Sequence, residues 1–454
     1  MILLDNADGC QLPMDPAPEQ ENTTSVSIGA YARLVRGNRN FRRLWSAQIV
    51  SEIGDWFYSL AIYSLLLELT GRPSSVALAL VLQVLPLALI GPTAGVVNDR
   101  IRRKQVMIIA DLARMVIVFC MLLVRTREMV WLVYPLLLLE SIMAGFFEPA
   151  RSSAIPNIVP REDLVVANTL SATIWSLNLA IGALLGGAVA ALLGREAVFA
   201  LNALSFLGSA LLISGMRFVE PHAEHGEPLR IRELFDFSAI WAGVRYIGSD
   251  LRLVAMVCVR SGIGFLGAGW VYFTVMGQRT FPVTAGGINP ERGAMLGMSL
   301  LMGSRGVGAL LGPFFSASWA GTQEKRLRAG ILVGFLMGAI GYLLLGKAPW
   351  LWLACAFVIF AHSGTSTVWV FSSTLLQLNT DDRFRGRVFA ADFGLCMLVI
   401  AIAGYVAGLL LDAGAPVRFL ASATGACMLI PFVIWAFALR LWREQPSTVT
   451  ASRD

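Results

Sequence analysis

The sequence predicts an all-α membrane protein with 12 transmembrane helices in two six-helix pseudo-repeats. Of its 454 residues, 56% are hydrophobic and only 15% are charged, whereas an ordinary soluble domain has about 25% charged residues. The mean hydropathy is +0.67, and apolar stretches of about 20 residues, long enough to cross a bilayer as helices, recur along the chain. A β-barrel would instead show short segments of alternating polarity.

Apolar windows mark the expected spans in chain order. Their cores are residues 44–68, 76–97, 105–124, 131–149, 168–193, 197–216, 252–276, 294–319, 328–346, 350–375, 388–411 and 416–440. The longest polar stretch between spans separates six of them from the other six, which predicts two bundles.

The expected organisation has five parts. They are a disordered cytosolic tail (1–38), an N-terminal six-helix bundle (39–216), a central cytosolic loop (217–245), a C-terminal six-helix bundle (246–442) and a cytosolic tail (443–454). The segments PARSSAIPNIVPREDLVVANTL (149–170) and SSTLLQLNTDDRFRGRVFAAD (372–392) occupy the same place in each half. Two parallel repeats of this kind occur in secondary transporters.

The basic residues orient the spans. Most of the 36 Lys and Arg residues lie before the first span, after each even-numbered span and after the last. By the positive-inside rule, both termini then lie in the cytosol of a cell (inner) membrane protein. Because the positive charge is spread over many loops and not gathered in one patch, a nucleic-acid partner is not expected.

Cofactor and metal chemistry are not indicated. The 6 cysteines are scattered, without C-x-x-C spacing, so neither a zinc site nor a disulfide framework is expected. No Walker A, His/Cys-cluster or serine-nucleophile motif appears, which disfavours an enzyme. We expect no cofactor and no bound metal.

The loop between the second and third spans reads GVVNDRIRRKQ (95–105). A six-plus-six arrangement with G-x-x-x-D-R-x-x-R-K in this loop resembles the major facilitator superfamily. The match consists of Gly95, Asp99, Arg100, Arg103 and Lys104, while Arg102 stands where the family usually has glycine.

The resemblance implies that this loop is a conformational latch. Asp99 would face the positive end of the eleventh helix near Arg387, and the basic residues would hold the halves together on the cytosolic side. The alternative is a simple positive-inside anchor. That alternative explains Arg102 and Lys104. It does not explain Asp99, because the positive-inside rule concerns basic residues and not acids.

Finer features resemble the bacterial efflux branch that includes enterobactin exporters and macrolide efflux proteins. They are NFRRLWSAQIVSEIGDWFYSLA (40–61), FEPARSSAIPNIVPREDLVVAN (147–168) and RGRVFAAD (385–392). IGALLGG (181–187) resembles the G-P-x-x-G-G motif of exporters, with Ala183 in place of proline. The arginine that many drug/proton antiporters carry in the fourth helix is missing, and Glu140 is the ionisable residue in that span core.

Charged residues inside the spans are candidates for transport chemistry, because a charge at the helix centre costs about 2.5–3.5 kcal/mol. Glu52 and Asp55 share one face of the first span. Two acids so close repel, which favours protonation of one of them, so they are candidates for proton coupling or substrate contact. Alternatively, they pair with Arg305 or Arg260 from the other half.

Other candidates have two interpretations each. Glu140 is a second proton or substrate candidate, or a structural partner of Asn178. Arg305, in the eighth span, is a counter-ion for Asp55 or binds an anionic substrate. His362 either titrates near neutral pH or packs with its hydrogen bonds satisfied.

Asp111 and Arg114 lie three residues apart in the third span, and we expect an ion pair that extends the latch. Asp392, early in the eleventh span, is expected in the same cytosolic network. Some aromatic and amide residues are expected to line a central cavity for an apolar, aromatic or cationic molecule. These cavity candidates are Trp56, Tyr63, Trp175, Asn178, Trp270 and Trp369.

The sequence therefore predicts a monomeric secondary active exporter of a small hydrophobic molecule, such as a drug-like compound or siderophore. Its partners would be that molecule, protons and the lipid bilayer, and transport would proceed by alternating access with proton antiport. An importer or a lipid or lysophospholipid transporter of the same fold is the alternative. A membrane scaffold without transport activity is a more distant one.

Overall fold

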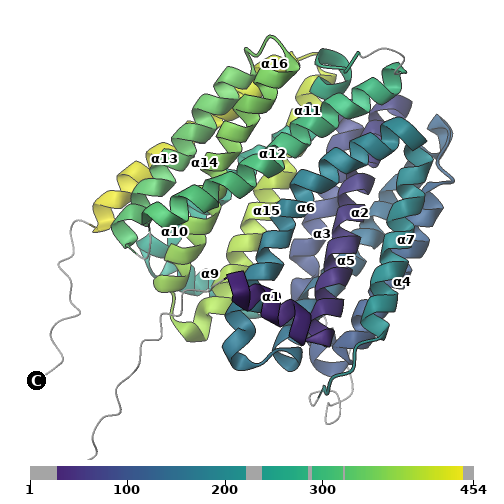
Figure 1. Cartoon of the computed structure of the whole chain (residues 1–454). Helices are drawn as coiled ribbons and strands as arrows, with labels where there is room; N and C mark the ends of the chain where they lie inside the picture. The colour runs from purple at the N-terminus through teal and green to yellow at the C-terminus, as the bar shows by residue number, and fades with distance from the viewer. Residues whose placement is uncertain (1–27, 221–237, 285–288, 321–322, 443–454) are drawn as a thin grey trace, which may run out of the picture.

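The structure, a computed structural model, describes residues 28–220, 238–284, 289–320 and 323–442, and within these ranges it contains helices and no strand. Long helices run along a common direction in two groups, one from each half of the chain (Figure 1). The apolar helices confirm the predicted all-α membrane fold and make the chain a multi-pass membrane protein.

The N-terminal half contains six long helices. They are α2 (Arg39–Thr70), α3 (Pro73–Arg100), α4 (Arg103–Met121), α5 (Val133–Ile158) after the short η1 (Arg127–Leu132), α6 (Leu164–Leu193) after η2 (Arg161–Asp163), and α7 (Arg195–Ser214). Local sequence sets their limits. The Asn38 side chain accepts a hydrogen bond from the Phe41 amide at 2.9 Å and caps the start of α2. Gly71, at φ +68°, ends that helix.

The C-terminal half repeats this pattern. Its first span consists of α10 (Leu251–Ser261), η4 (Gly262–Leu266), α11 (Gly267–Val275) and η5 (Met276–Thr280) in direct succession. The others are α12 (Pro290–Ala320), α13 (Glu324–Leu345), α14 (Leu351–Leu378), α15 (Asp382–Asp412) and α16 (Val417–Ala438), which leads into η6 (Leu439–Trp442).

Each predicted span core overlaps one of these helices. Within the described residues, 9 helices are long and apolar enough to cross a membrane. The first, third and fifth predicted spans are not among the 9, although α6 contains the shorter apolar stretch Leu177–Leu193. α2 and α4 carry the charged residues that the sequence marks as functional, including Asp55 and Arg114. The total of twelve crossings stays a prediction.

Two expected loop or tail segments contain helices. Residues 28–37 of the expected tail form α1 (Ile28–Gly37), because Tyr31, Leu34 and Val35 lie on one side and pack on the N-terminal core. Part of the expected central loop belongs to α9 (Ser238–Gly248), which packs against α15. Residues 1–27, 221–237 and 443–454 lie outside the described residues.

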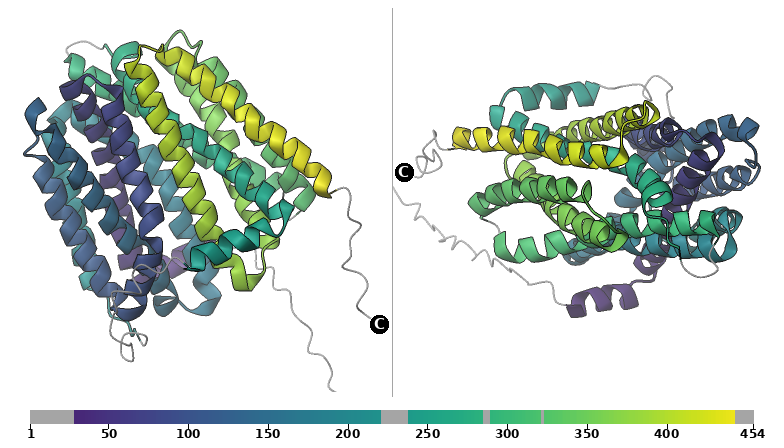
Figure 2. Two further views of the ribbon diagram at one scale, coloured as in Figure 1. Left: turned by 180° about the vertical axis from the view of Figure 1, so that it is seen from behind. Right: turned by 90° about the horizontal axis from the view of Figure 1, so that it is seen from above.

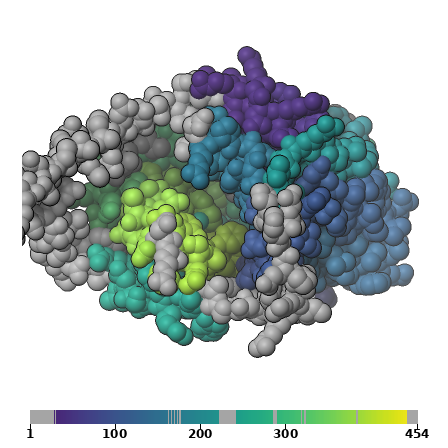
Figure 3. Space-filling view, turned by 90° about the horizontal axis from the view of Figure 1, so that it is seen from below, coloured from purple at the N-terminus to yellow at the C-terminus, as the bar shows by residue number. Residues whose placement is uncertain are grey.

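α1 and α9 lie at the same end of the bundle, here called the α1 end, and the opposite end is the far end (Figure 1). Figure 2 shows α1 outside the main bundle when the molecule is viewed from above. In Figure 3, which looks onto the α1 end, α1 (purple) lies at the edge of this face beside the blue and teal N-terminal half.

The two halves join through α6 against α12 and α3 against α15. Glycine allows the first contact: a Cβ on Gly306 would lie 2.4 Å from the Ala180 amide nitrogen, and one on Gly187 would lie 2.1 Å from the Ser299 hydroxyl. Both distances are too short for any side chain. Small residues therefore bring these two helices into backbone contact, as is common in membranes.

Several hydrogen bonds between described residues connect the halves toward the far end. Gln278 donates to the Ser64 hydroxyl at 3.0 Å, Arg279 donates to the Gly71 carbonyl at 3.0 Å, and Arg195 forms an ion pair with Glu291. At the α1 end, by contrast, a Cβ on Gly95 of α3 or on Gly386 of α15 would meet nothing within 4 Å. The hydrogen bonds described between the halves thus gather toward the far end, while open space lies beside Gly95 and Gly386 at the α1 end.

Candidate functional site

A buried ion-pair network occupies the middle of the N-terminal half. Arg114 of α4 donates to Asp111 at 2.5 Å and lies 3.8 Å from Asp55 of α2. Asp111 also accepts a hydrogen bond from Ser209 of α7 at 2.6 Å. The expected Asp111–Arg114 pair is present, because residues three apart share one helix face. The Arg114 guanidinium also lies over the Phe206 ring, 4.3 Å from its centroid.

Asp55 is more accessible than its partner. Its side chain is 34% exposed, whereas that of Arg114 is 4% exposed. One oxygen of Asp55, Oδ1, is buried and has no hydrogen-bond partner among the described residues. The carboxylate is therefore held on one side by Arg114 and has acceptor capacity left for a proton or a ligand.

Glu52 belongs to a second polar network, one helix turn closer to the α1 end. It accepts hydrogen bonds from Gln48 at 2.7 Å and from Asn178 of α6 at 3.0 Å. Arg151 of α5 donates to the other side of Gln48 at 3.0 Å and to Glu148 at 2.7 Å. This network connects α5, α2 and α6 around the candidate acid.

Glu148, Arg151 and Gln48 are residues that the sequence interpretation missed. A signal was present, since Glu148 and Arg151 have the same acid-x-x-Arg spacing as Asp111 and Arg114. Arg151 lies beyond the predicted span core 131–149, whereas the helix α5 extends to Ile158.

Glu140 of α5 is buried, 7% exposed, and lies within electrostatic range of Asp55 and Arg114. Among the described residues the Asn178 amide donates to Glu52 and not to Glu140. Asp55 and Glu140 are thus gathered around Arg114, whereas Glu52 lies in the network of Arg151.

The C-terminal half has its own ion pair. Arg260 of α10 lies 2.8 Å from Asp392 of α15 and over the Trp369 ring, 4.1 Å from its centroid. The expectation that Arg260 pairs with an acid of the first span is therefore wrong. Asp392 is placed with Arg260 and not with Asp111 and Arg114, because α15 packs against α10 and α11.

Arg305 of α12 has no acidic partner among the described residues. It is 9% exposed, its guanidinium lies 4.3 Å from the Trp270 ring centroid, and its Nη1 has no hydrogen-bond partner there. The expectation that Arg305 is the counter-ion of Asp55 is therefore wrong. Arg114, from the same half as Asp55, occupies that role.

Three of the predicted cavity residues meet where the halves join. Trp56 of α2 stacks on Trp270 of α11 with ring centroids 5.5 Å apart, and Tyr63 meets the same indole edge-on at 6.4 Å. Tyr63 also hydrogen-bonds Gln83 of α3. The Trp175 side chain lies outside the described part of the structure.

His362 packs within the C-terminal half. Its Nε2 lies 2.7 Å from the Tyr342 hydroxyl, and the residue is 4% exposed. This placement matches the interpretation of a packed histidine with a hydrogen bond.

Among the described residues, Asp99, Arg103 and Lys104 form no ion pair or hydrogen bond across the halves. Asp99 is exposed at the end of α3 and Gly95 has open space beside it. Arg103 and Lys104 instead donate to carbonyls of their own half, at Ser153 (2.7 Å) and Met216 (2.8 Å). Arg100, the last residue of α3, is partly buried.

Comparisons with known proteins agree with this architecture. Residues 28–452 match the model of the MFS_3 family, described as transmembrane secretion effector. Macrolide efflux protein A of Streptococcus pyogenes is 24% identical over 383 residues, covering 82% of this chain and 89% of that protein. The MFS-type transporter YfiS of Bacillus subtilis is 29% identical over 182 residues, 40% of this chain and 43% of YfiS.

A solved structure of a bacterial homolog of the human lysosomal transporter Spinster, inward-facing and unoccupied, covers 93% of this chain and 100% of its own. The TM-score is 0.65 at 14% identity. At this identity the likeness concerns the fold alone.

Proposed function

This chain belongs to the transmembrane secretion effector family of major facilitator transporters, and we propose that it exports a small, largely hydrophobic molecule by proton-coupled antiport. The observation that carries this proposal is the Asp55 carboxylate, whose side chain is 34% exposed and lies 3.8 Å from the buried Arg114. Such a carboxylate can exchange a proton for a ligand at the centre of the molecule.

The charge balance of the N-terminal half supports proton coupling. Five acids surround two arginines there, Arg114 and Arg151. The acids are Glu52, Asp55, Asp111, Glu140 and Glu148. Unpaired negative charge is costly away from bulk water, so binding protons or a cation lowers the free energy of this cluster.

The arrangement of the halves supports loading from the α1 end. This end carries most of the basic residues, and the positive-inside rule assigns it to the cytosol. Open space lies beside Gly95 and Gly386 at this end, and the hydrogen bonds described between the halves gather at the far end, which favours entry of a substrate from the cytosol. In this scheme the protein lies in the cell membrane with both termini cytosolic.

Arg305 and Trp270 supply the substrate side of the scheme. A charge at mid-membrane is destabilising by about 2.5–3.5 kcal/mol. A desolvated cation–π contact stabilises it by only about 2 kcal/mol. The remaining cost favours a further anionic partner. A substrate with an aromatic or apolar body and one anionic group would stack with Trp56 and Trp270 and neutralise Arg305.

Import, or transport of a lipid or lysophospholipid, is the alternative for the same fold. The name of the macrolide efflux relative favours export. Orientation alone does not separate the two directions, since a cytosol-open state occurs in both cycles. An amphiphilic lipid would also fit an apolar site that contains one arginine, because its chains are apolar and its headgroup is polar.

Everted membrane vesicles test the proposal. Dyes, antibiotics and siderophores are screened for accumulation in vesicles with and without a protonophore. We expect at least one compound to accumulate only while the pH gradient lasts. Asp55→Asn should abolish the dependence on the gradient, because it removes the exchangeable proton.

Glu128→Gln, an exposed acid in η1, is the matched control and should behave as the wild type. Gradient-dependent accumulation by the Asp55→Asn variant would remove Asp55 from the coupling mechanism. If the vesicles instead lose compound relative to empty controls, the direction is import.

A further inference from the structure

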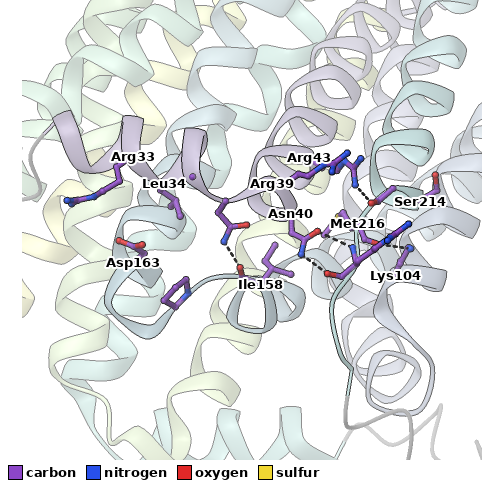
Figure 4. A pocket seen from close by; sticks show the side chains of 15 residues that line it. Arg33, Leu34, Arg39, Asn40, Arg43, Lys104, Ile158, Asp163, Ser214 and Met216 are labelled. Atoms are coloured by element: carbon purple, nitrogen blue, oxygen red, sulfur yellow. Dashed lines mark hydrogen bonds between the residues drawn. The ribbon is translucent and has the colours of Figure 1, made fainter.

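A cavity of about 950 Å³ opens at the α1 end of the N-terminal half. α1 and the start of α2 form one wall, and the ends of α5 and α7 and the start of α4 form the others (Figure 4). It is separate from the central network, because Glu52, Asp55 and Arg114 are not among its lining residues. Its charged lining residues are Arg33, Arg39, Arg43, Lys104, Arg217 and Asp163.

Hydrogen bonds to backbone groups hold the walls in place. Asn38 donates to the Ile158 carbonyl at 2.6 Å. The Asn40 amide donates to the Arg217 carbonyl at 2.7 Å and accepts from the Arg217 amide at 3.0 Å. Arg43 donates to the Gly215 carbonyl, and Lys104 to that of Met216 (Figure 4). The α1–α2 corner is thereby fastened to the ends of α5 and α7.

Positive charge predominates in the described lining of the cavity, although the Lys104 backbone amide also donates to the Glu220 carboxylate at 3.4 Å. Five basic side chains line it against one acid, Asp163. Among the described residues none of the five forms an ion pair, and the side chains of Arg33 and Arg39 are exposed without a hydrogen bond. A fixed concavity with several free guanidinium groups favours a phosphate group, which guanidinium binds through paired hydrogen bonds.

α1 has the character of a helix at a membrane surface. It runs across the end of the bundle (Figure 1), with Leu34 buried against the N-terminal core and Arg33 and Arg36 exposed. Basic clusters beside an amphipathic helix at a membrane boundary attract anionic lipids.

We propose that this cavity binds the phosphate-bearing headgroup of an anionic glycerophospholipid from the leaflet at the α1 end. The lipid source is favoured over free phosphate because the cavity lies where the long helices end, and its volume suits a small organic group. The bound headgroup would bridge Arg33 of α1 and Arg39 of α2 and stabilise the α1–α2 corner. This inference does not depend on the transported substrate or on proton coupling.

Thermal unfolding of the full chain in detergent micelles tests the site. Phosphatidylglycerol, phosphatidylcholine and inorganic phosphate are added separately. For the wild type we expect phosphatidylglycerol to raise the melting temperature by about 2 °C or more above phosphatidylcholine, and phosphate to have no such effect. Arg33→Gln with Arg39→Gln should lose most of the rise, and because both side chains are exposed the variant should fold.

Arg127→Gln with Arg292→Gln removes the same charge from exposed sites at the far end and should keep the full rise. The proposal is overturned if the Arg33/Arg39 variant keeps the rise, or if the far-end variant loses as much of it. An equal rise with inorganic phosphate, lost in the same variant, would overturn the lipid assignment in favour of a soluble anion.

Discussion

Arg114 and Arg305 have opposite surroundings although both lie within spans. Arg114 has two acids within 3.8 Å, whereas Arg305 rests on an indole with no acid beside it among the described residues. Removing one member of a buried pair leaves the other charge uncompensated. Arg114 is therefore expected to matter for folding as well as transport, and Arg305 for ligand recognition.

The substrate role of Arg305 gives a residue-scale prediction. In proteoliposomes, Arg305→Gln should raise the KM for an anionic aromatic substrate by about 10-fold or more, because a charged hydrogen bond contributes about 1.5–3 kcal/mol. The KM for a neutral compound should change little. Arg305→Lys should lie in between, since it keeps the charge but loses the planar stack on Trp270.

Arg292→Gln, an exposed site at the start of the same helix α12, is the control. Equal losses for anionic and neutral compounds would mean that Arg305 has a structural role and does not recognise charge.

At the element scale, the contact between α6 and α12 determines how closely the halves meet. Gly306 faces the backbone of Ala180, and Gly187 faces Ser299. Residues of this size allow two helices to pack with their backbones in contact. In the sequence these glycines appear only as a property of two separate spans, and the pairing of those spans is a feature of the folded bundle.

A matched pair of glycine substitutions tests this contact. Gly306→Ala should destabilise the protein by about 1–3 kcal/mol, because the new methyl overlaps the α6 backbone. Gly394→Ala in α15, where a Cβ meets nothing within 4 Å, should be neutral or stabilising by up to ~1 kcal/mol, since alanine favours helix. Thermal unfolding of the purified variants measures both. Equal melting temperatures for the two would contradict a tight α6–α12 contact.

On the scale of the whole molecule, the two halves carry complementary excess charge. Acids outnumber arginines in the buried networks of the N-terminal half. In the C-terminal half Arg260 pairs with Asp392, and Arg305 has no acidic partner among the described residues. The halves meet at Trp56 and Trp270. Relative motion of two such bodies about a central site is how alternating access is expected to work.

The latch gives a whole-molecule prediction. Asp99 is exposed in this arrangement, so Asp99→Asn should leave the melting temperature unchanged here. It should slow transport, because the acid is expected to stabilise the arrangement in which the halves close at the α1 end. Melting curves and transport rates in liposomes measure the two effects, with the exposed Glu196→Gln as control. A wild-type transport rate would exclude the latch.

The sequence by itself determined the class, the helices and the local pairs. Long apolar runs can be buried only as membrane helices, so the predicted cores coincide with the helices found, and spacing along one helix was enough for Asp111 and Arg114. Tertiary structure decided the long-range partners: Arg114 rather than Arg305 for Asp55, Asn178 for Glu52, and Arg260 for Asp392. The reason is physical: hydropathy depends on neighbours along the chain, whereas a charge finds its partner according to which helices pack side by side.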